Sequence, residues 1–245
     1  MRALILRIDA PMISFGSVIV DHHGFTDYFP GISMLTGMIG NALGWNHSES
    51  DKLQELQDRL DFAARWDVRP QRVIDYHTVD LGSPKMRKPG WTTRGEAEHR
   101  AGGTAAKYGT HQRYRHYLVD GLMTLALGLK TGGSPDLEAI RTAFERPARP
   151  LFIGRKTCLP SRPLLDPITP IVEGEDLVTA LETVPVWSRE GVPEEENKKT
   201  WACWTPSSEV ENVGERRLVY DLRDWHTQLP TGSRWRKEGW IGGGK

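Results

Sequence analysis

Two runs of β-forming residues, "DFAARWDV" (residues 61–68) and "RVIDYHTVDL" (residues 72–81), decide the fold of this chain. Only "RPQ" separates them, and a short break containing proline between two such runs predicts a β-hairpin. Within the second run, Asp75 and His77 share one face of the strand and Tyr76 lies on the other. The group "DYHT" has the residue types of acid–base chemistry, but this spacing favours a structural hydrogen bond between Asp75 and His77.

The residues before this hairpin predict one strand and two helices. Leu4, Leu6 and Ile8 alternate with Arg7 and Asp9 at the end of this run, which is typical of a strand with one buried face. "ISMLTGMIGNALGW" (residues 32–45) has helical spacing behind a Ser33 cap, although it contains two glycines that weaken a helix. A second short helix is predicted to begin near Ser50.

The residues after the hairpin predict two strands and one helix around a basic segment of about residues 84–116. "YLVDGLMTLALGL" (residues 117–129) is predicted to be a strand, Ser134–Pro135 begin a helix that Pro147 stops, and "PLFIGRKTCL" (residues 150–159) is predicted to be a final strand. This order indicates an α+β protein with a ferredoxin-like, split βαβ domain over residues 1–160. Residues 161–245 are rich in Pro, Trp and charge, and predict a smaller, mostly β domain.

Charge is segregated along a chain that is neutral overall, with 32 basic and 32 acidic residues. From Lys85 to Arg115 there are eight Lys and Arg against two Glu, a net charge of +6. From Glu173 to Glu196 there are eight acids against one Arg, a net charge of −7. Electrostatic attraction to a polyanion is therefore expected only locally.

The basic segment is typical of a site for single-stranded nucleic acid, because cations neutralise phosphates and aromatic rings stack on bases. The candidates for phosphate contact there are Arg94, Arg100, Lys107, Arg113 and Arg115, and those for base stacking are Tyr108 and Tyr114. "FIGRKTC" adds Gly154, Arg155 and Lys156 as a possible phosphate clamp. The alternative for the basic segment is a solvated surface loop whose charges balance those of the acidic stretch after Glu173. The alternative for Arg155 and Lys156 is that they are ordinary surface cations.

Several classes of protein are disfavoured by the sequence. Two cysteines are too few for a disulfide framework or a four-ligand zinc site, and adjacent His22 and His23 lack a third ligand at metal spacing. Arg7 and Asp9 break the N-terminal apolar run, so we expect neither a signal peptide nor a membrane span, and a cytoplasmic protein. Phosphate-binding glycine loops, nucleophile elbows and zinc-protease helix motifs are not found, which disfavours a generic enzyme. We expect no metal ion and no organic cofactor.

Five stretches together resemble one family: "LRIDAPMISFG", "GISMLTGMIGNALGW", "LDFAARWDV" leading to "DYHTVDLG", "YRHYLVDGLMTLAL" and "RPARPLFIGRKTCLPSRPLL". They are similar to the CasD family of type I-E CRISPR Cascade subunits, within the repeat-associated RAMP proteins. The resemblance runs from residue 2 to about residue 165, and residues beyond it match poorly.

This resemblance implies a ferredoxin-like domain with a basic thumb (residues 84–117) and a non-catalytic role in holding CRISPR RNA (crRNA). The implied partners are the 5′ handle of the crRNA, the CasC backbone subunit, which this subunit caps, and the large subunit CasA. Target DNA would be reached only through the assembled complex, in which base pairing reads the sequence. The resemblance also places the loop Ser14, Phe15 and Gly16 near the handle. The complete set of predicted RNA-binding residues is Ser14, Phe15, Gly16, Arg94, Arg100, Lys107, Tyr108, His111, Arg113, Tyr114, Arg115, Gly154, Arg155 and Lys156.

Two other functions stay open at this point. Some relatives in other CRISPR subtypes cut repeat RNA without a metal, and "KYGTH" supplies Lys107, Tyr108 and His111 as residue types for such chemistry. A pure assembly protein, whose basic thumb binds only an acidic partner, is the third possibility.

Overall fold

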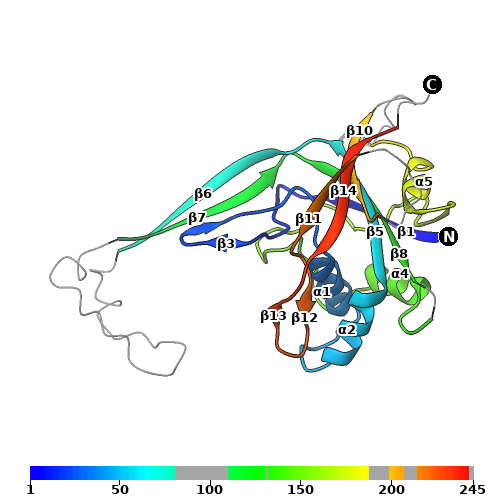
Figure 1. The fold of residues 1–245 in the computed structure, drawn as a ribbon, viewed down its shortest axis with the longest axis horizontal. Coiled ribbons are helices and arrows are strands. Elements are labelled where there is room, and N and C mark those ends of the chain that lie inside the picture. Colours follow the sequence, from blue (N-terminus) through cyan, green and yellow to red (C-terminus); the bar gives the residue numbers. More distant parts are fainter. Residues whose placement is uncertain (81–109, 131, 188–198, 207–213, 243–245) are drawn as a thin grey trace.

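A seven-stranded antiparallel sheet forms the centre of the molecule (Figure 1). The computed structural model describes residues 1–80, 110–130, 132–187, 199–206 and 214–242. The strands, in spatial order, are β11 (Glu215–Val219), β14 (Arg234–Ile241), β10 (Thr200–Trp204), β5 (Leu60–Val68), β8 (Leu122–Leu129), β1 (Arg2–Asp9) and β9 (Ile171–Glu173).

Helices cover both faces of this sheet. On one face, α1 (Ile32–Ala42), α2 (Ser50–Arg59) and α4 (Leu137–Glu145) pack on a core that includes Leu4, Leu6 and Ile8. On the other face, α5 (Leu177–Glu182) packs on a second core that includes Ala3 and Ile5. The predicted N-terminal strand is confirmed, but both of its faces are buried.

The polar face of β1 is buried because Arg7 is neutralised inside the protein. Arg7 donates to Asp166 Oδ2 at 2.7 Å and to Asp67 Oδ2 at 3.0 Å, and Arg65 donates to Asp67 Oδ1 at 2.8 Å. Burial disfavours the charged guanidinium, and the pKa of Arg7 is lowered in spite of these carboxylates. Paired in this way, the charges are tolerated in the interior.

Residues 61–81 do not form the predicted hairpin. β5 pairs with β8 and β10, whereas β6 (Gln71–Asp80) pairs with β7 (Thr110–Val119). The registers are continuous, apart from one irregularity between Trp66 and Val68: Leu60 faces Leu129 in the sheet and Asp80 faces Thr110 beyond it. β5 and β6 are therefore two parts of one long bent strand, and β8 and β7 are the matching parts of its partner.

We call β6 and β7 together the arm, which extends away from the central sheet (Figure 1). Three short strands join it: β2 (Met12–Ile13), β3 (Ile19–Val20) and β4 (His23–Gly24), in the order β2-β7-β4-β3. β4 runs parallel to β7, with His23 opposite Tyr114. The loop that leads into α1 is thereby fixed against the arm.

Several sequence predictions hold at the level of single elements and others do not. The helix predicted near Ser50 is α2, and the helix predicted after Pro135 is α4, with Asp136 as its N-cap. Residues 150–159 contain no strand, and β9 occupies the edge position beside β1 instead. β10, β14 and β11 extend the same sheet from residues 161–245, and β12 (Arg223–Asp224) pairs with β13 (Leu229–Pro230). The division of the chain at residue 160 stays a prediction.

The predicted Ser33 cap is wrong, because Asp221, which is distant in the sequence, accepts the hydrogen bonds at the start of α1. The N-cap of α1 is Gly31, which has no side chain to accept a hydrogen bond. Asp221 supplies the acceptors: its Oδ2 accepts from the backbone N–H of Ile32 at 3.1 Å, and its backbone oxygen accepts from that of Ser33 at 3.1 Å. A free helix N-terminus needs such acceptors.

Candidate nucleic-acid interface

Two loops that the sequence predicts to bind RNA, at residues 14–16 and 154–156, meet in the structure. The backbone N–H of Ser14 donates to Ile153 O at 3.3 Å, and Gly154 has a left-handed φ of +83°. A Cβ on Gly154 would lie 1.6 Å from Ser14 O, so only glycine allows this approach. Ser14 and Phe15 are buried, whereas Gly16 is exposed. Contacts from this loop to a ligand would therefore come from Gly16 and its backbone.

Arg155 links this loop pair to the arm. Its guanidinium donates to His116 O on β7 at 3.1 Å and to Gly24 O on β4 at 2.8 Å. The same group lies 4.7 Å from the centre of the Tyr117 ring. Arg155 is half-buried, whereas Lys156 is exposed. Arg155 thus has a structural role in addition to any phosphate contact, and Lys156 is the more available cation of the pair.

One face of the arm carries the arginines. Arg113 lies opposite His77, and Arg115 lies opposite Asp75. His77 Nε2 is 2.5 Å from Asp75 Oδ2, so the hydrogen bond predicted within "DYHT" is confirmed. Both arginines are exposed. This face therefore offers two cations beside a single carboxylate that already has a partner.

The opposite face of the arm carries aromatic rings. Tyr114 stacks on His23 of β4 with a centroid distance of 4.7 Å, and it lies 5.0 Å from Tyr76 of β6. Phe25 and His116 continue the cluster, 4.7 Å apart. The rings thus form a row across three strands, which we call the aromatic row. A base that stacked here would add to an existing row of rings.

His116 closes the aromatic row at the base of the arm. Its Nε2 is 3.4 Å from His23 Nδ1, and its own Nδ1 is buried with no protein partner among the described residues. Burial lowers the pKa of His116 below its ordinary 6.5, and the nearby charges of His23, Arg72 and Arg155 lower it further.

A groove of about 820 Å³ runs beside α1, next to the two loops. Ser14, Phe15, Gly16, Gly154 and Arg155 all line it. Its other basic and aromatic lining residues include Arg149, Arg217, Arg223, Trp45, Tyr220 and Trp225. Gly37 of α1 also lines the groove, and a Cβ there would meet Trp225 at 3.5 Å. The groove therefore has the cations and rings that a single strand of nucleic acid needs.

The C-terminal wall of the groove was missed by the sequence predictions. Tyr220, Arg223 and Trp225 lie in "LVYDLRDW" (residues 218–225), a part of the chain to which no function was assigned. Arg223 lies 5.5 Å from the centre of the Trp225 ring. Interleaved arginine and aromatic residues, the pattern that drew attention to the basic segment, were the available signal.

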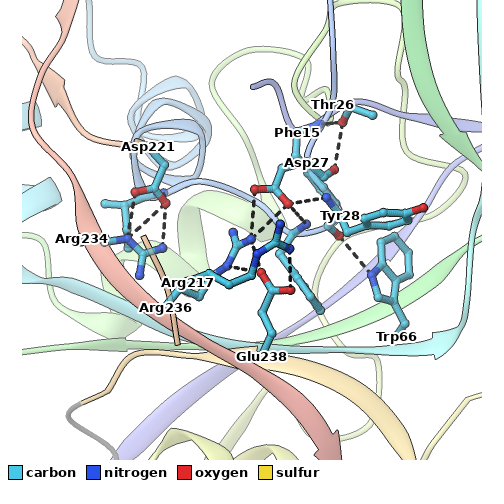
Figure 2. Close-up of polar contacts among 12 residues, drawn as sticks. Phe15, Thr26, Asp27, Tyr28, Trp66, Arg217, Asp221, Arg234, Arg236 and Glu238 are labelled. Carbon is cyan, nitrogen blue, oxygen red and sulfur yellow. Dashed lines mark hydrogen bonds and ion pairs between the residues drawn. The ribbon is translucent and has the colours of Figure 1, made fainter. Parts of the chain in front are cut away.

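Buried ion pairs attach this wall to the N-terminal half (Figure 2). Arg236 Nη2 contacts Asp27 Oδ2 at 3.0 Å and Glu238 Oε1 at 2.5 Å, and its side chain is 2% exposed. Burial disfavours the charge on Arg236, but Cys203 and the carboxylates of Asp27 and Glu238 together outweigh it, and the pKa is raised above its ordinary value. Arg234 holds Asp221 through Nη2 to Oδ2 at 2.7 Å, beside the start of α1 (Figure 2).

Several predicted site residues lie outside the part of the chain that the structure describes. These are Arg94, Arg100, Lys107 and Tyr108, and of His111 only the backbone position on β7, opposite Val79, is described. In the described ranges, no group of three or more His, Cys, Asp or Glu residues is arranged to hold a metal ion. Nor is any described helix both long and apolar enough to cross a membrane.

Comparison with known proteins assigns the family. The model of the family described as CRISPR-associated protein (Cas_Cas5) matches residues 3–237. The chain is also 30% identical over 169 residues to the CRISPR system Cascade subunit CasD of Escherichia coli (strain K12). The matched region covers 66% of this chain and 68% of CasD. This chain therefore belongs to the Cas5 family of CRISPR-associated proteins. The resemblance to CasD drawn from the sequence motifs is confirmed.

Two solved structures share the fold. A chain of a "CRISPR RNA-guided surveillance complex" superposes with a TM-score of 0.70 at 24% identity, over 98% of this chain and 90% of that one. A "Crystal structure of Cas protein" superposes with a TM-score of 0.60 at 24% identity, over 98% and 95% of the two chains. The mixed α+β architecture with mostly antiparallel sheets is thus a known Cas fold.

Proposed function

We propose that this protein is a non-catalytic crRNA-binding subunit of a type I-E Cascade complex. It holds the 5′ handle of the crRNA in the groove and against the base of the arm. It caps the CasC backbone, contacts CasA, and meets target DNA only through the assembled complex, in the cytoplasm. The observation that carries this proposal is the meeting of the Ser14–Gly16 loop with Gly154 and Arg155 along one groove, together with the hydrogen bond from Arg155 to His116 O of the arm.

The strand order supports a ferredoxin-like interpretation of the central sheet. β1, α1, β5, β8, α4 and β9 follow one another in the chain, and their strands lie in the antiparallel order β5-β8-β1-β9. This is the split βαβ pattern, with the arm as the distal half of its central β5–β8 hairpin. In that interpretation, the loops at one end of the sheet hold the RNA, because strand aromatics of the common RNA-binding type are not available on β1 and β8.

A handle-binding experiment tests the proposal. The protein, alone and with backbone subunits, is mixed with repeat RNA labelled at either end in EDTA, and both gel shift and fragment length are followed. We expect an intact RNA that shifts only when it carries the mature 5′ handle. An equal shift without the handle contradicts the proposal.

Salt dependence of binding provides a second measurement with a matched control. Replacing Arg113 and Arg115 by Gln should lower the slope of log affinity against log salt by about 1.4 for a single strand. Arg141→Gln on α4 removes one half-buried surface cation far from the arm in the sequence, and it should leave the slope unchanged. Equal effects of the arm and α4 variants contradict a phosphate contact by the arm.

Endoribonuclease activity is the alternative function. Site-specific cutting in EDTA that is abolished by changing Lys107 or His111 would establish it, whereas intact RNA supports the non-catalytic role. A pure assembly role predicts that ribonuclease leaves the complex intact, while an RNA-dependent complex dissolves.

A further inference from the structure

The outer edge of β6 is an unusual surface for a small protein. β6 pairs with β7 along its whole length, and in the described part of the chain no strand pairs with its other edge. The strand contains neither Lys nor Pro, the residues that commonly protect an edge from pairing with another chain. Its apolar side chains are also exposed: Val73 by 43%, Ile74 by 52%, Tyr76 by 50% and Val79 by 43%. An edge of this kind is a template for strand addition.

The sequence of β6 is complementary to itself in the antiparallel direction. With Tyr76 on a two-fold axis perpendicular to the sheet, Tyr76 meets its own copy and Asp75 meets His77 of the second copy. Ile74 then meets Thr78, and Val73 meets Val79. Aromatic pairs, β-branched pairs and hydrogen-bonding side-chain pairs are among those that stabilise neighbouring strands.

The two neighbouring registers lose the pairing of Asp75 with His77. A two-fold axis perpendicular to the sheet pairs residues of the same face, so the register can shift only in steps of two residues. A shift in one direction places Asp75 directly opposite Asp75 of the second copy. A shift in the other places His77 opposite His77 and leaves Asp75 opposite Val79. Of these three registers, only the pairing centred on Tyr76 places the Asp75 carboxylate opposite the His77 imidazole, so the edge favours that register.

We propose that the free protein forms a two-fold symmetric dimer in which β6 pairs with β6 of a second copy. The two arms become one continuous sheet, and the aromatic rows join through Tyr76, which lies 5.0 Å from Tyr114 in each copy. The proposal does not depend on RNA binding. It assigns the β6 edge to a second copy of this chain whenever no other partner covers it.

Disulfide trapping tests the register directly. The natural cysteines, Cys158 and Cys203, are buried and will not interfere. Tyr76→Cys places two thiols on the axis, within the Cα separation that a disulfide requires. In Val73→Cys the two thiols are six residues apart in register, about 20 Å at about 3.3 Å per residue, which is too far.

We expect mild oxidation to convert Tyr76→Cys to a covalent dimer on a non-reducing gel and to leave Val73→Cys monomeric. Val79→Cys alone should also stay monomeric, but a mixture of Val73→Cys and Val79→Cys should cross-link. Equal cross-linking of Tyr76→Cys and Val73→Cys would mean random collision and would overturn the proposal, as would no cross-link in Tyr76→Cys.

Sedimentation of the protein without introduced cysteines supplies an independent measurement. The unmodified chain should sediment as a monomer–dimer mixture whose dimer fraction rises between about 1 μM and about 1 mM. Asp75→Lys should abolish the dimer, because it removes the carboxylate that faces His77 of the second copy. A variant with both Asp75→His and His77→Asp should form the dimer, because the carboxylate–imidazole pair across the axis and the hydrogen bond within the strand are both present again. A monomer at all concentrations, or an exchanged variant that stays monomeric, would contradict β6 pairing.

Discussion

A single glycine controls how closely the two loops of the groove approach each other. Gly154 combines a left-handed φ of +83° with a Cβ position 1.6 Å from Ser14 O. We predict that Gly154→Ala lowers the free energy of unfolding by about 3 kcal/mol or more, because the backbone of one loop must move. Urea unfolding followed by tryptophan fluorescence measures this.

Gly132 is the matched control for that substitution. Its φ is +89°, but a Cβ there would have nothing within 4 Å. Gly132→Ala should therefore show only the strain of left-handed backbone, about 1 kcal/mol. If the two variants are destabilised equally, the close approach of the loops makes no contribution to stability.

His116 gives the arm a predicted dependence on pH. Because its folded pKa lies below 6.5, the unfolded chain takes up the proton first as the pH falls. The stability conferred by neutral His116 is therefore complete above 6.5 and is lost as the pH falls toward the lowered folded pKa. The melting temperature should drop more between about pH 7.5 and about pH 5.5 in the natural protein than in His116→Gln. Parallel pH profiles for the two proteins would exclude this role.

At the scale of elements, Arg155 connects β4 to β7. Lysine cannot reach both carbonyls with a planar fork, so Arg155→Lys should release β4 from the arm. The hydrogen bond from the Tyr114 N–H to His22 O, 2.9 Å long, reports on this contact. We expect hydrogen exchange of the Tyr114 amide to become at least about tenfold faster. Lys156→Gln, at the exposed neighbouring position, should leave that exchange rate unchanged while weakening RNA binding.

Elements defined by local pattern were predicted well, and pairings between distant segments were not. α2, α4 and β1 follow from apolar spacing and capping residues close in sequence. The hairpin at residues 61–81 failed because β10, over 130 residues later, occupies one edge of β5 and β8 occupies the other. Rules based on neighbouring residues cannot predict which distant strands will pair with β5.

The candidate site shows the same division. The residues at 14–16 and 154–156 were identified from the resemblance and the local pattern, and the structure brings all of them except Lys156 together in one groove. The structural tie of Arg155 and the burial of Phe15 depend on three-dimensional packing, so the sequence could not predict them. The wall at residues 218–225 is held beside the groove by contacts with segments far away in the sequence, such as those of Asp221 with Ile32 and of Trp225 with Gln57.

At the scale of the whole molecule, Arg236 joins residues 209 positions apart by contacting Asp27. Arg236→Met leaves Asp27 and Glu238 as a pair of carboxylates without their shared cation. We predict a loss of about 3 to 5 kcal/mol in the free energy of unfolding, because one partner of a buried ion pair is removed.

Arg141→Met provides the surface comparison for this substitution. Arg141 pairs with Glu138 and Glu145 on the exposed side of α4. Its loss should change stability by less than about 1 kcal/mol. Equal losses in the free energy of unfolding of the Arg141 and Arg236 variants would show that the buried ion pair contributes no more to stability than the surface pair.

Because Asp221 accepts hydrogen bonds from the first turn of α1, the groove is completed only late in synthesis. Chains fold from the N-terminus as they leave the ribosome. Throughout most of synthesis, α1 exists without its acceptor and the groove beside it without one wall, since both come from residues 218–236. A nascent or prematurely terminated chain thus presents an unfinished groove, and only a fully translated copy is ready to take up its ligand.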